Sequence, residues 1–182
     1  TNIPQMDTST DKLETSHYDI TLDHVSFGYD KRQVIHDISL NIPEHTTCAI
    51  VGPSGSGKTT LCNLIARFWD VQDGAVRIGG KDVKNYTADS ILEHISMVFQ
   101  NVYLFHDSIE NNIKFGKPDA THEEVEAAAK RACCHDFISA LPDGYNTIIG
   151  EGGSTLSGGE KQRISIARAI LKDAPIIILD EA

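Results

Sequence analysis

One nine-residue stretch limits the possible folds more than any other part of this 182-residue sequence. Residues 52–60 read Gly-Pro-Ser-Gly-Ser-Gly-Lys-Thr-Thr and fit the pattern G-x-x-x-x-G-K-[ST]. An apolar segment, Thr46–Val51, precedes them and an amphipathic segment, Thr59–Trp69, follows, so we expect a strand, a glycine loop and a helix. Because glycines let successive N–H groups turn inward, the loop is predicted to bind phosphate. Lys58 would place its charge on the β- and γ-phosphates, and Thr59 would offer its hydroxyl to Mg²⁺.

Composition and charge exclude several functional classes. The chain is 40% hydrophobic and 23% charged, which is ordinary for a globular domain and argues against global disorder. The net charge of −10 argues against a free-standing nucleic-acid-binding protein, although backbone N–H groups can bind phosphate without a basic excess. No apolar stretch approaches the roughly 20 residues of a membrane span. The polar segment Thr1–Thr15 lacks the basic and apolar regions of a signal peptide.

The cysteines and histidines do not indicate a metal site. Their spacing fits no zinc pattern, and adjacent cysteines are poor disulfide partners. We therefore expect buried, reduced thiols of a cytosolic protein at Cys48, Cys62, Cys133 and Cys134.

The rest of the chain divides into an α/β beginning and a helical middle. Alternation and apolar runs predict strands at Tyr18–Tyr29, Val34–Ile42, Ala75–Ile78, Ile95–Gln100 and Ala174–Leu179. Helices are expected at Thr87–His94 and from Ser157 to about Lys172, and the section from Asn101 to Gly153 has a helical pattern. In that section an acidic first turn, Glu123 to Glu126, precedes an alanine run and suits a helix N-terminus. We interpret it as a helical subdomain inserted into an α/β core.

A second chemical signal ends the chain. The segment Ile176–Leu179 is fully apolar, which predicts a central strand of a parallel sheet that is buried on both faces. Acids at the carboxyl end of such a strand lie where these sheets bind ligands. We therefore assign Asp180 to Mg²⁺, through water, and Glu181 to the polarisation of an attacking water molecule.

A third signal lies about 100 residues after the phosphate loop. Residues 156–163 read Leu-Ser-Gly-Gly-Glu-Lys-Gln-Arg and are predicted to open a helix, with Ser157 as its cap. The paired glycines expose the N-terminal N–H groups, so this terminus is a second candidate anion site. One nucleotide hardly needs two unrelated phosphate sites in one chain. We infer that the second site serves a nucleotide bound to another copy.

Together, residues 52–60, Gln100, 156–160 and 176–181 resemble the nucleotide-binding domain of ATP-binding cassette transporters of the exporter type. The resemblance implies an α/β fold: a P-loop NTPase core with a parallel sheet, an N-terminal antiparallel β subdomain and an inserted α-helical subdomain. Residues 1–17 would be a linker or tail, and 18–182 the domain. Within it, 18–100 and 173–182 would form the ATP-binding core, and 101–172 the helical and signature subdomain.

The resemblance also implies roles for single residues. Tyr29 would stack on adenine, and Gln100 would touch both Mg²⁺ and the attacking water at the hinge to the helical subdomain. Residues 150–152 resemble the segment that senses the membrane domain, and Val102–Ile109, with exposed Tyr103, Leu104 and Phe105, the groove where a coupling helix docks. The implied ATP contacts are Tyr29, Gly52, Pro53, Ser54, Gly55, Ser56, Gly57, Lys58, Thr59, Thr60, Gln100, Ser157, Gly158, Gly159 and Glu160. The implied Mg²⁺ contacts are Thr59, Gln100 and Asp180, and the catalytic residues are Glu181, Lys58 and Gln100.

The sequence departs from the family pattern at three places. His45 stands near the position where many relatives carry a glycine, and histidine tolerates a positive φ better than most residues. Glu160 replaces a frequent glutamine, which we interpret as a tolerated variant. The family continues past Ala182 with an interface-crossing loop and a switch histidine, so we expect a truncated domain of lowered stability and turnover.

Three functions are compatible with these residues. The leading hypothesis is the ATPase motor of a membrane exporter, in which two copies, identical or different, bind ATP and Mg²⁺ between them on the cytoplasmic side of the membrane and act on a transmembrane domain. A non-transport cassette ATPase acting on nucleic acid or ribosomes is a second, against which the acidic charge and the exporter-like segment Val102–Ile109 argue. A nucleotide-binding module without turnover is the third. Glu181 and Lys58 argue against it for the parent protein, and the truncation argues for it here.

Overall fold

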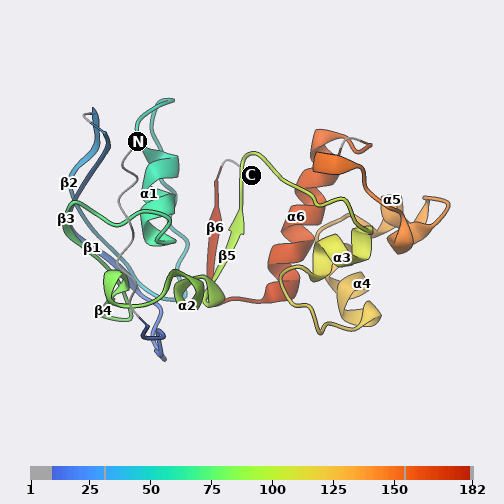
Figure 1. The fold of residues 1–182 in the computed structure, drawn as a ribbon, viewed down its shortest axis with the longest axis horizontal. Coiled ribbons are helices and arrows are strands. Elements are labelled where there is room, and N and C mark those ends of the chain that lie inside the picture. Colours follow the sequence, from blue (N-terminus) through green and yellow to red (C-terminus); the bar gives the residue numbers. More distant parts are fainter. Residues whose placement is uncertain (1–9, 31, 154, 181–182) are drawn as a thin grey trace. The chain divides into compact units, whose positions relative to one another are not determined.

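The computed structural model describes residues 10–30, 32–153 and 155–180, and no side chain is described for Glu151. The chain forms two compact units, Thr1–Ile95 and Ser96–Ala182 (Figure 1). Each unit is described by itself.

An antiparallel sheet forms the first unit. Its strands are β1 (Ile20–Tyr29), β2 (Arg32–Ile42), β3 (Asp73–Ile78) and β4 (Lys81–Asp82), in the order β2-β1-β3-β4. Side chains of β1 alternate between buried and more exposed over most of its length, which confirms the half-buried strand predicted from the sequence. The pairing of β1 with β2 shifts register between Leu22 and Val25, because His24 adopts a positive φ of 50°.

The helices of the first unit are short. They are α1 (Lys58–Ile65), the 3₁₀ turn η1 (Val83–Asn85) and α2 (Ala88–Glu93). The prediction that the first helix extends to Trp69 was wrong: it ends at Ile65 because Arg67 takes the left-handed conformation, with φ 55°. Leu61, Leu64 and Ile65 form its buried face, as the periodicity predicted.

The segment Thr46–Val51 is not a strand. It joins no sheet among the described residues, and Val51 is 89% exposed. An apolar run becomes a buried parallel strand only when neighbouring strands pair with it on both sides, and in the described part of the chain neither sheet includes it. Just before it, His45 has a positive φ of 59°, which histidine tolerates better than most residues.

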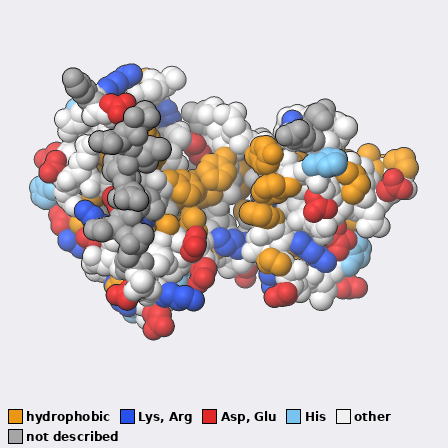
Figure 2. Space-filling model, in the orientation of Figure 1, with side chains coloured by type: hydrophobic (Ala, Val, Ile, Leu, Met, Phe, Trp, Pro, Cys, Tyr) orange, Lys and Arg blue, Asp and Glu red, His pale blue; other side chains and the backbone are white. Residues whose placement is uncertain are grey.

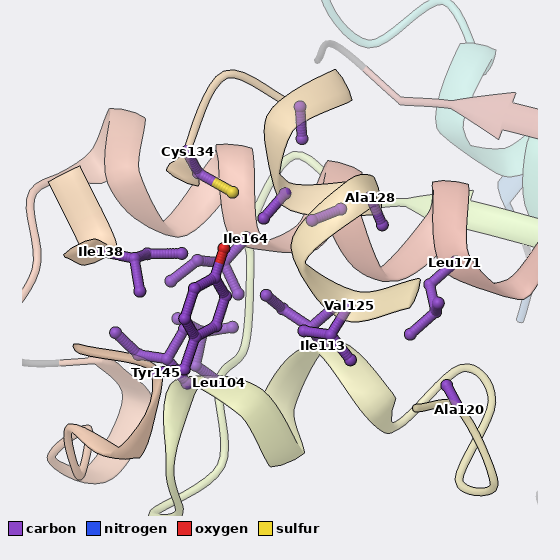
Figure 3. Packing of buried hydrophobic residues seen from close by; sticks show 14 of the residues in the cluster. Leu104, Ile113, Ala120, Val125, Ala128, Cys134, Ile138, Tyr145, Ile164 and Leu171 are labelled. Carbon is purple, nitrogen blue, oxygen red and sulfur yellow. The ribbon is translucent and has the colours of Figure 1, made fainter. Parts of the chain in front are cut away.

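The second unit is mainly helical, as the sequence predicted. It contains α3 (Ile109–Lys114), α4 (His122–Arg131), α5 (His135–Ser139), α6 (Gly158–Lys172) and the 3₁₀ turns η2 (Gly144–Asn146) and η3 (Glu151–Gly153). Thr121 and Glu124 form a capping box at the start of α4, at the acidic turn identified from the sequence. The helices meet over one apolar core, which includes Leu104, Val125 and Ile164 (Figure 3).

Strands β5 (Ile95–Val98) and β6 (Ile176–Leu179) form a two-stranded sheet in which both strands run in the same direction (Figure 1). The prediction that β6 is buried on both faces was wrong. Ile176 and Ile178 are buried, whereas Ile177 and Leu179 are 59% and 60% exposed. Helix α6 is joined to this sheet where the Ser96 hydroxyl donates to the Ala169 carbonyl.

Surface features agree with the acidic composition. On the face drawn in Figure 2, Lys and Arg side chains of the described residues lie between Asp and Glu side chains. None of the described helices is long and apolar enough to cross a membrane. All four cysteines are free; Cys134 is buried as expected, whereas Cys48 and Cys133 are exposed, so the expectation of burial was wrong for those two.

Candidate nucleotide-binding site

The first unit brings Tyr29 next to the helix that follows the glycine loop. The Tyr29 hydroxyl lies 3.3 Å from the hydroxyl of Thr60, which is buried in the first turn of α1. The ring stands edge-on to Trp69, with centroids 5.7 Å apart, and to Phe27 at 5.1 Å. These contacts fix the ring while leaving the residue 38% exposed, so part of it is available for stacking.

Sequence reasoning missed the residues that hold Tyr29 in place. Besides Trp69, Gln72 supports the end of β1 by binding both backbone groups of Gly28: its amide nitrogen donates to the Gly28 carbonyl and its oxygen accepts from the Gly28 N–H, each at 3.0 Å. Gly28 also lies close to the start of β2: a Cβ at this position would lie 2.5 Å from the Arg32 carbonyl oxygen, so a larger residue would not fit. Nothing in the sequence around Gln72 indicates that it binds the backbone of a distant strand.

The glycine loop has the backbone that the motif requires. Gly55 and Gly57 have φ values of 77° and 93°, which L side chains rarely adopt. A Cβ at Gly57 would also lie 2.8 Å from Ile35 Cδ1, so the loop is tightly seated on β2 at this point. The Ser56 N–H donates to the Pro53 carbonyl and closes a turn within the loop. Residues 52–56 themselves are exposed.

Lys58 lies across this loop. Its ammonium donates to the carbonyl oxygens of Gly52, at 3.0 Å, and Pro53, at 3.1 Å. An ammonium has three donors, so it can hold the loop and still donate to an anion. The two threonines that follow differ: Thr59 is exposed, whereas Thr60 is buried beside Tyr29. Thr59 is therefore the threonine placed to reach a bound ion, and Thr60 supports the aromatic ring.

The second unit brings Gln100 and Asp180 to one edge of the small sheet. The Asp180 N–H donates to the Val98 carbonyl at 2.9 Å, so Asp180 lies beside the end of β5. Gln100 follows Val98 by two residues. Asp180 is only 7% exposed, whereas Gln100 is exposed. Parallel strands place their carboxyl ends at the same edge of a sheet, which is where such sheets bind ligands. The candidate base, Glu181, lies outside the described residues.

The signature residues open α6 with a self-contained cap. The Glu160 N–H donates to the Ser157 hydroxyl at 3.3 Å, and the Glu160 carboxylate accepts from both the hydroxyl and the N–H of Ser157 at 2.7 Å. The bond from the Ser157 hydroxyl has the larger effect and the bond from the Ser157 N–H the smaller, and together they hold the pKa of the Glu160 carboxyl below its usual value. Nothing lies within 4 Å of a Cβ built on Gly158, and at Gly159 the nearest atom is an Arg163 nitrogen at 3.7 Å, so this terminus is sterically open.

Two of the three residues expected to be exposed in the segment 102–109 are exposed. Tyr103 and Phe105 are 57% and 39% exposed and pack edge-on at 5.4 Å. The expectation that Leu104 is exposed was wrong, because its side chain is fully buried in the helical core. The Arg168 guanidinium lies over the Phe105 ring, 5.8 Å from its centroid, and its own pKa is lowered by burial.

The oxygen donors at these positions suit Mg²⁺ rather than a softer metal. Thr59 offers a hydroxyl, Gln100 an amide oxygen and Asp180 a carboxylate, which are the ligand types that Mg²⁺ takes alongside phosphate oxygens and water. Among the described residues, no group of three or more His, Cys, Asp and Glu side chains is arranged to bind a metal on its own.

Comparison with known proteins supports this interpretation. The profile of the family described as "ABC transporter" matches residues 35–182. An ATP-dependent lipid A-core flippase of Desulfotalea psychrophila is 53% identical over 158 residues, 87% of this chain and 28% of that protein. A β-(1→2)glucan export ATP-binding/permease protein, NdvA, of Brucella suis is 52% identical over 165 residues, 90% of this chain and 28% of the relative.

A solved structure agrees. The structure of a bacterial Atm1-family ABC exporter with ATP bound aligns with a TM-score of 0.91 and 42% identity, over 98% of this chain and 31% of that one. The chain thus spans less than a third of the length of these relatives. The glycine loop, the aromatic beside it, the acid that ends β6 and the capped glycine pair at α6 occur together here, and the chain belongs to the ABC transporter family.

Proposed function

We propose that this chain is the ATP-binding and ATP-hydrolysing domain of an ABC exporter, on the cytoplasmic side of a membrane. Its relatives are named as exporters and flippases, and in them the matching segment is under a third of the protein. In this proposal the cycle of ATP binding and hydrolysis drives the association and separation of two such domains. A transmembrane domain would convert that motion into transport of the substrate.

ATP binding would use the first unit. The exposed part of Tyr29 would stack on adenine, a contact worth roughly 1–3 kcal/mol. The N–H groups of residues 52–60 would bind the phosphates, together with the positive end of the α1 dipole. Lys58 would exchange one or both of its carbonyl contacts for β- and γ-phosphate oxygens.

The Thr59 hydroxyl would contact Mg²⁺, and the family resemblance implies Gln100 and Asp180, the latter through water, as its other protein contacts. When bound, Mg²⁺ neutralises the charge that develops on the transferred phosphoryl group. Asp180 is buried, and its N–H donates to the Val98 carbonyl, which fixes its backbone beside the end of β5. Gln100 would orient the attacking water, and Glu181 would polarise it for in-line attack on the γ-phosphorus.

A second copy would complete each site. The open terminus of α6 would contact the γ-phosphate of a nucleotide held by the partner domain, through the N–H groups of Gly158 and Gly159. The exposed aromatics Tyr103 and Phe105 would meet the transmembrane domain, since aromatic residues are enriched at protein interfaces.

Two observations support this proposal most strongly. The Lys58 ammonium lies across the glycine loop, bound to the Gly52 and Pro53 carbonyls, and Tyr29, beside the following helix, is partly exposed. The proposal is tested in the full-length protein that contains this sequence by Glu181→Gln. We expect ATP binding to persist, phosphate release to fall at least about a hundredfold, the range for loss of a general base, and the ATP-bound dimer to accumulate. Light scattering and a phosphate-release assay measure both. Continued hydrolysis with only separated domains in ATP would contradict the assignment of Glu181.

A further inference from the structure

Residues 11–18, which the sequence places partly in a linker, are attached to the first unit by several specific contacts. We call them the strap. The Thr87 N–H, at the cap of α2, donates to the Asp11 carbonyl at 2.9 Å. Two residues on, the Leu13 N–H donates to the Ser90 hydroxyl at 3.0 Å, and Leu13 is 3% exposed. A passive tail would neither bury a leucine nor bind a helix with its backbone.

His94, which ends α2, also binds the strap. Its Nε2 lies 3.0 Å from the Leu13 carbonyl oxygen. Because a carbonyl can only accept, this nitrogen carries the hydrogen, as it can in both the neutral and the charged ring. The Tyr18 ring lies against the imidazole, with centroids 5.5 Å apart. His94 therefore contacts the strap at two places, the Leu13 carbonyl and the Tyr18 ring.

The first unit is shaped to receive the strap on its other side. A Cβ at Gly79 would lie 2.3 Å from the His17 carbonyl oxygen and 2.4 Å from Thr15 Oγ1, so only glycine allows this approach. The Lys81 ammonium donates to the Glu14 carbonyl. Glu44 accepts from the Tyr18 N–H and binds the His17 ring, and these bonds lower the pKa of its carboxyl. The strap is thus held at both ends and in the middle.

The position of His94 gives these contacts a consequence. Directly after it the chain enters β5 at Ile95, passes from the first unit to the second, and reaches Gln100 five residues after Ile95. We propose that the strap fixes the start of β5, so that a displacement of the strap acts on the strand that leads to Gln100. Its relevance to ATP rests on the proposed function, because that function gives Gln100 its role.

Hydrogen exchange measured by mass spectrometry, without nucleotide, tests the proposal. Leu13→Ala should release the strap, and exchange in peptides covering residues 86–100 should become at least tenfold faster. Peptides covering 50–62 and 122–131 should be unchanged. The matched control is Val76→Ala, a buried residue of β3 away from the strap, which should speed exchange in the sheet and not selectively at 95–100. A uniform acceleration across the first unit by Leu13→Ala, or none at 95–100, would overturn the proposal.

Two further variants keep the test decisive if Leu13→Ala unfolds the unit. His94→Gln retains a side-chain donor and should exchange like the unaltered protein, whereas His94→Ala should reproduce the acceleration at 86–100. Equal exchange in the two variants would overturn the role of the Leu13 contact. Because no ATP is used, the outcome is separable from the proposed function: failure of the chain to bind ATP would defeat that function and leave the strap result standing.

Discussion

The N-termini of α1 and α6 are built differently although both are candidate phosphate sites. At α1 the cap is Gly57, which has no side chain to satisfy the first N–H groups, and the first turn contains no acid. At α6, Ser157 and Glu160 satisfy each other in a capping box, which places a carboxylate at the terminus. The first terminus therefore has no side-chain cap of its own and suits an external anion, whereas the second is capped by its own side chains.

The largest difference should appear when alanine replaces a glycine at each terminus. Gly57→Ala introduces strain from the positive φ and a 2.8 Å approach to Ile35, together about 2–4 kcal/mol of lost stability. Gly158→Ala meets no atom within 4 Å and should leave stability within about 0.5 kcal/mol. Urea unfolding monitored by circular dichroism measures both. Equal losses would show that the α1 terminus is no more constrained than the α6 terminus.

A smaller effect is expected from removing the α6 cap. Ser157→Ala should cost about 1 kcal/mol, the usual value for a lost Ser cap. Thr121→Ala, which removes the corresponding capping box at α4, should cost about as much and serves as the matched control. Only Ser157→Ala should also weaken ATP-driven dimerisation of the full-length protein, measured by light scattering. If both variants weaken it equally, α6 has no special part in the dimer.

The smallest effect concerns pH at Glu160. The Ser157 bonds lower the folded-state pKa of this carboxyl, so the stabilisation is fully present above its usual value of 4.5 and is lost as pH falls through the lower, folded value. Glu160→Gln keeps an acceptor oxygen and removes the titration. Exchange of the first-turn amides of α6 should therefore accelerate, relative to the intrinsic amide rate, below pH 4.5 in the unaltered protein and not in the variant. The same relative acceleration in both would contradict the assigned cause.

Local motifs were predicted well because their geometry follows from a few adjacent residues. The capping roles of Ser157 and the positive φ of His45 depend only on neighbouring backbone, and both were confirmed. Predictions that depended on other segments were wrong: Thr46–Val51 is not a strand, and Ile177 and Leu179 are exposed. An apolar run shows that a segment can be buried, but its burial requires partners that a local pattern does not identify.

Contacts between distant residues were also beyond sequence reasoning. The support of Tyr29 by Trp69 and Gln72 joins residues at least 40 positions apart, and neither has a motif. Leu104 was expected at the surface because the segment 102–109 resembles a docking groove, yet its side chain is buried in the helical core while Tyr103 and Phe105 on either side are exposed. The family resemblance predicts which residues act, whereas the structure shows which residues hold them.

The most direct test of the central claim is the affinity for Mg-ATP of the unaltered chain and of Lys58→Ala, measured by calorimetry. The Lys58 ammonium contacts two carbonyls of an exposed loop, so its loss should leave the fold intact, as circular dichroism will show. We predict a Kd at least about tenfold weaker, or 1.4 kcal/mol or more, for Lys58→Ala. An unchanged Kd in a folded Lys58→Ala variant would contradict the assignment of residues 52–60 as the phosphate-binding loop.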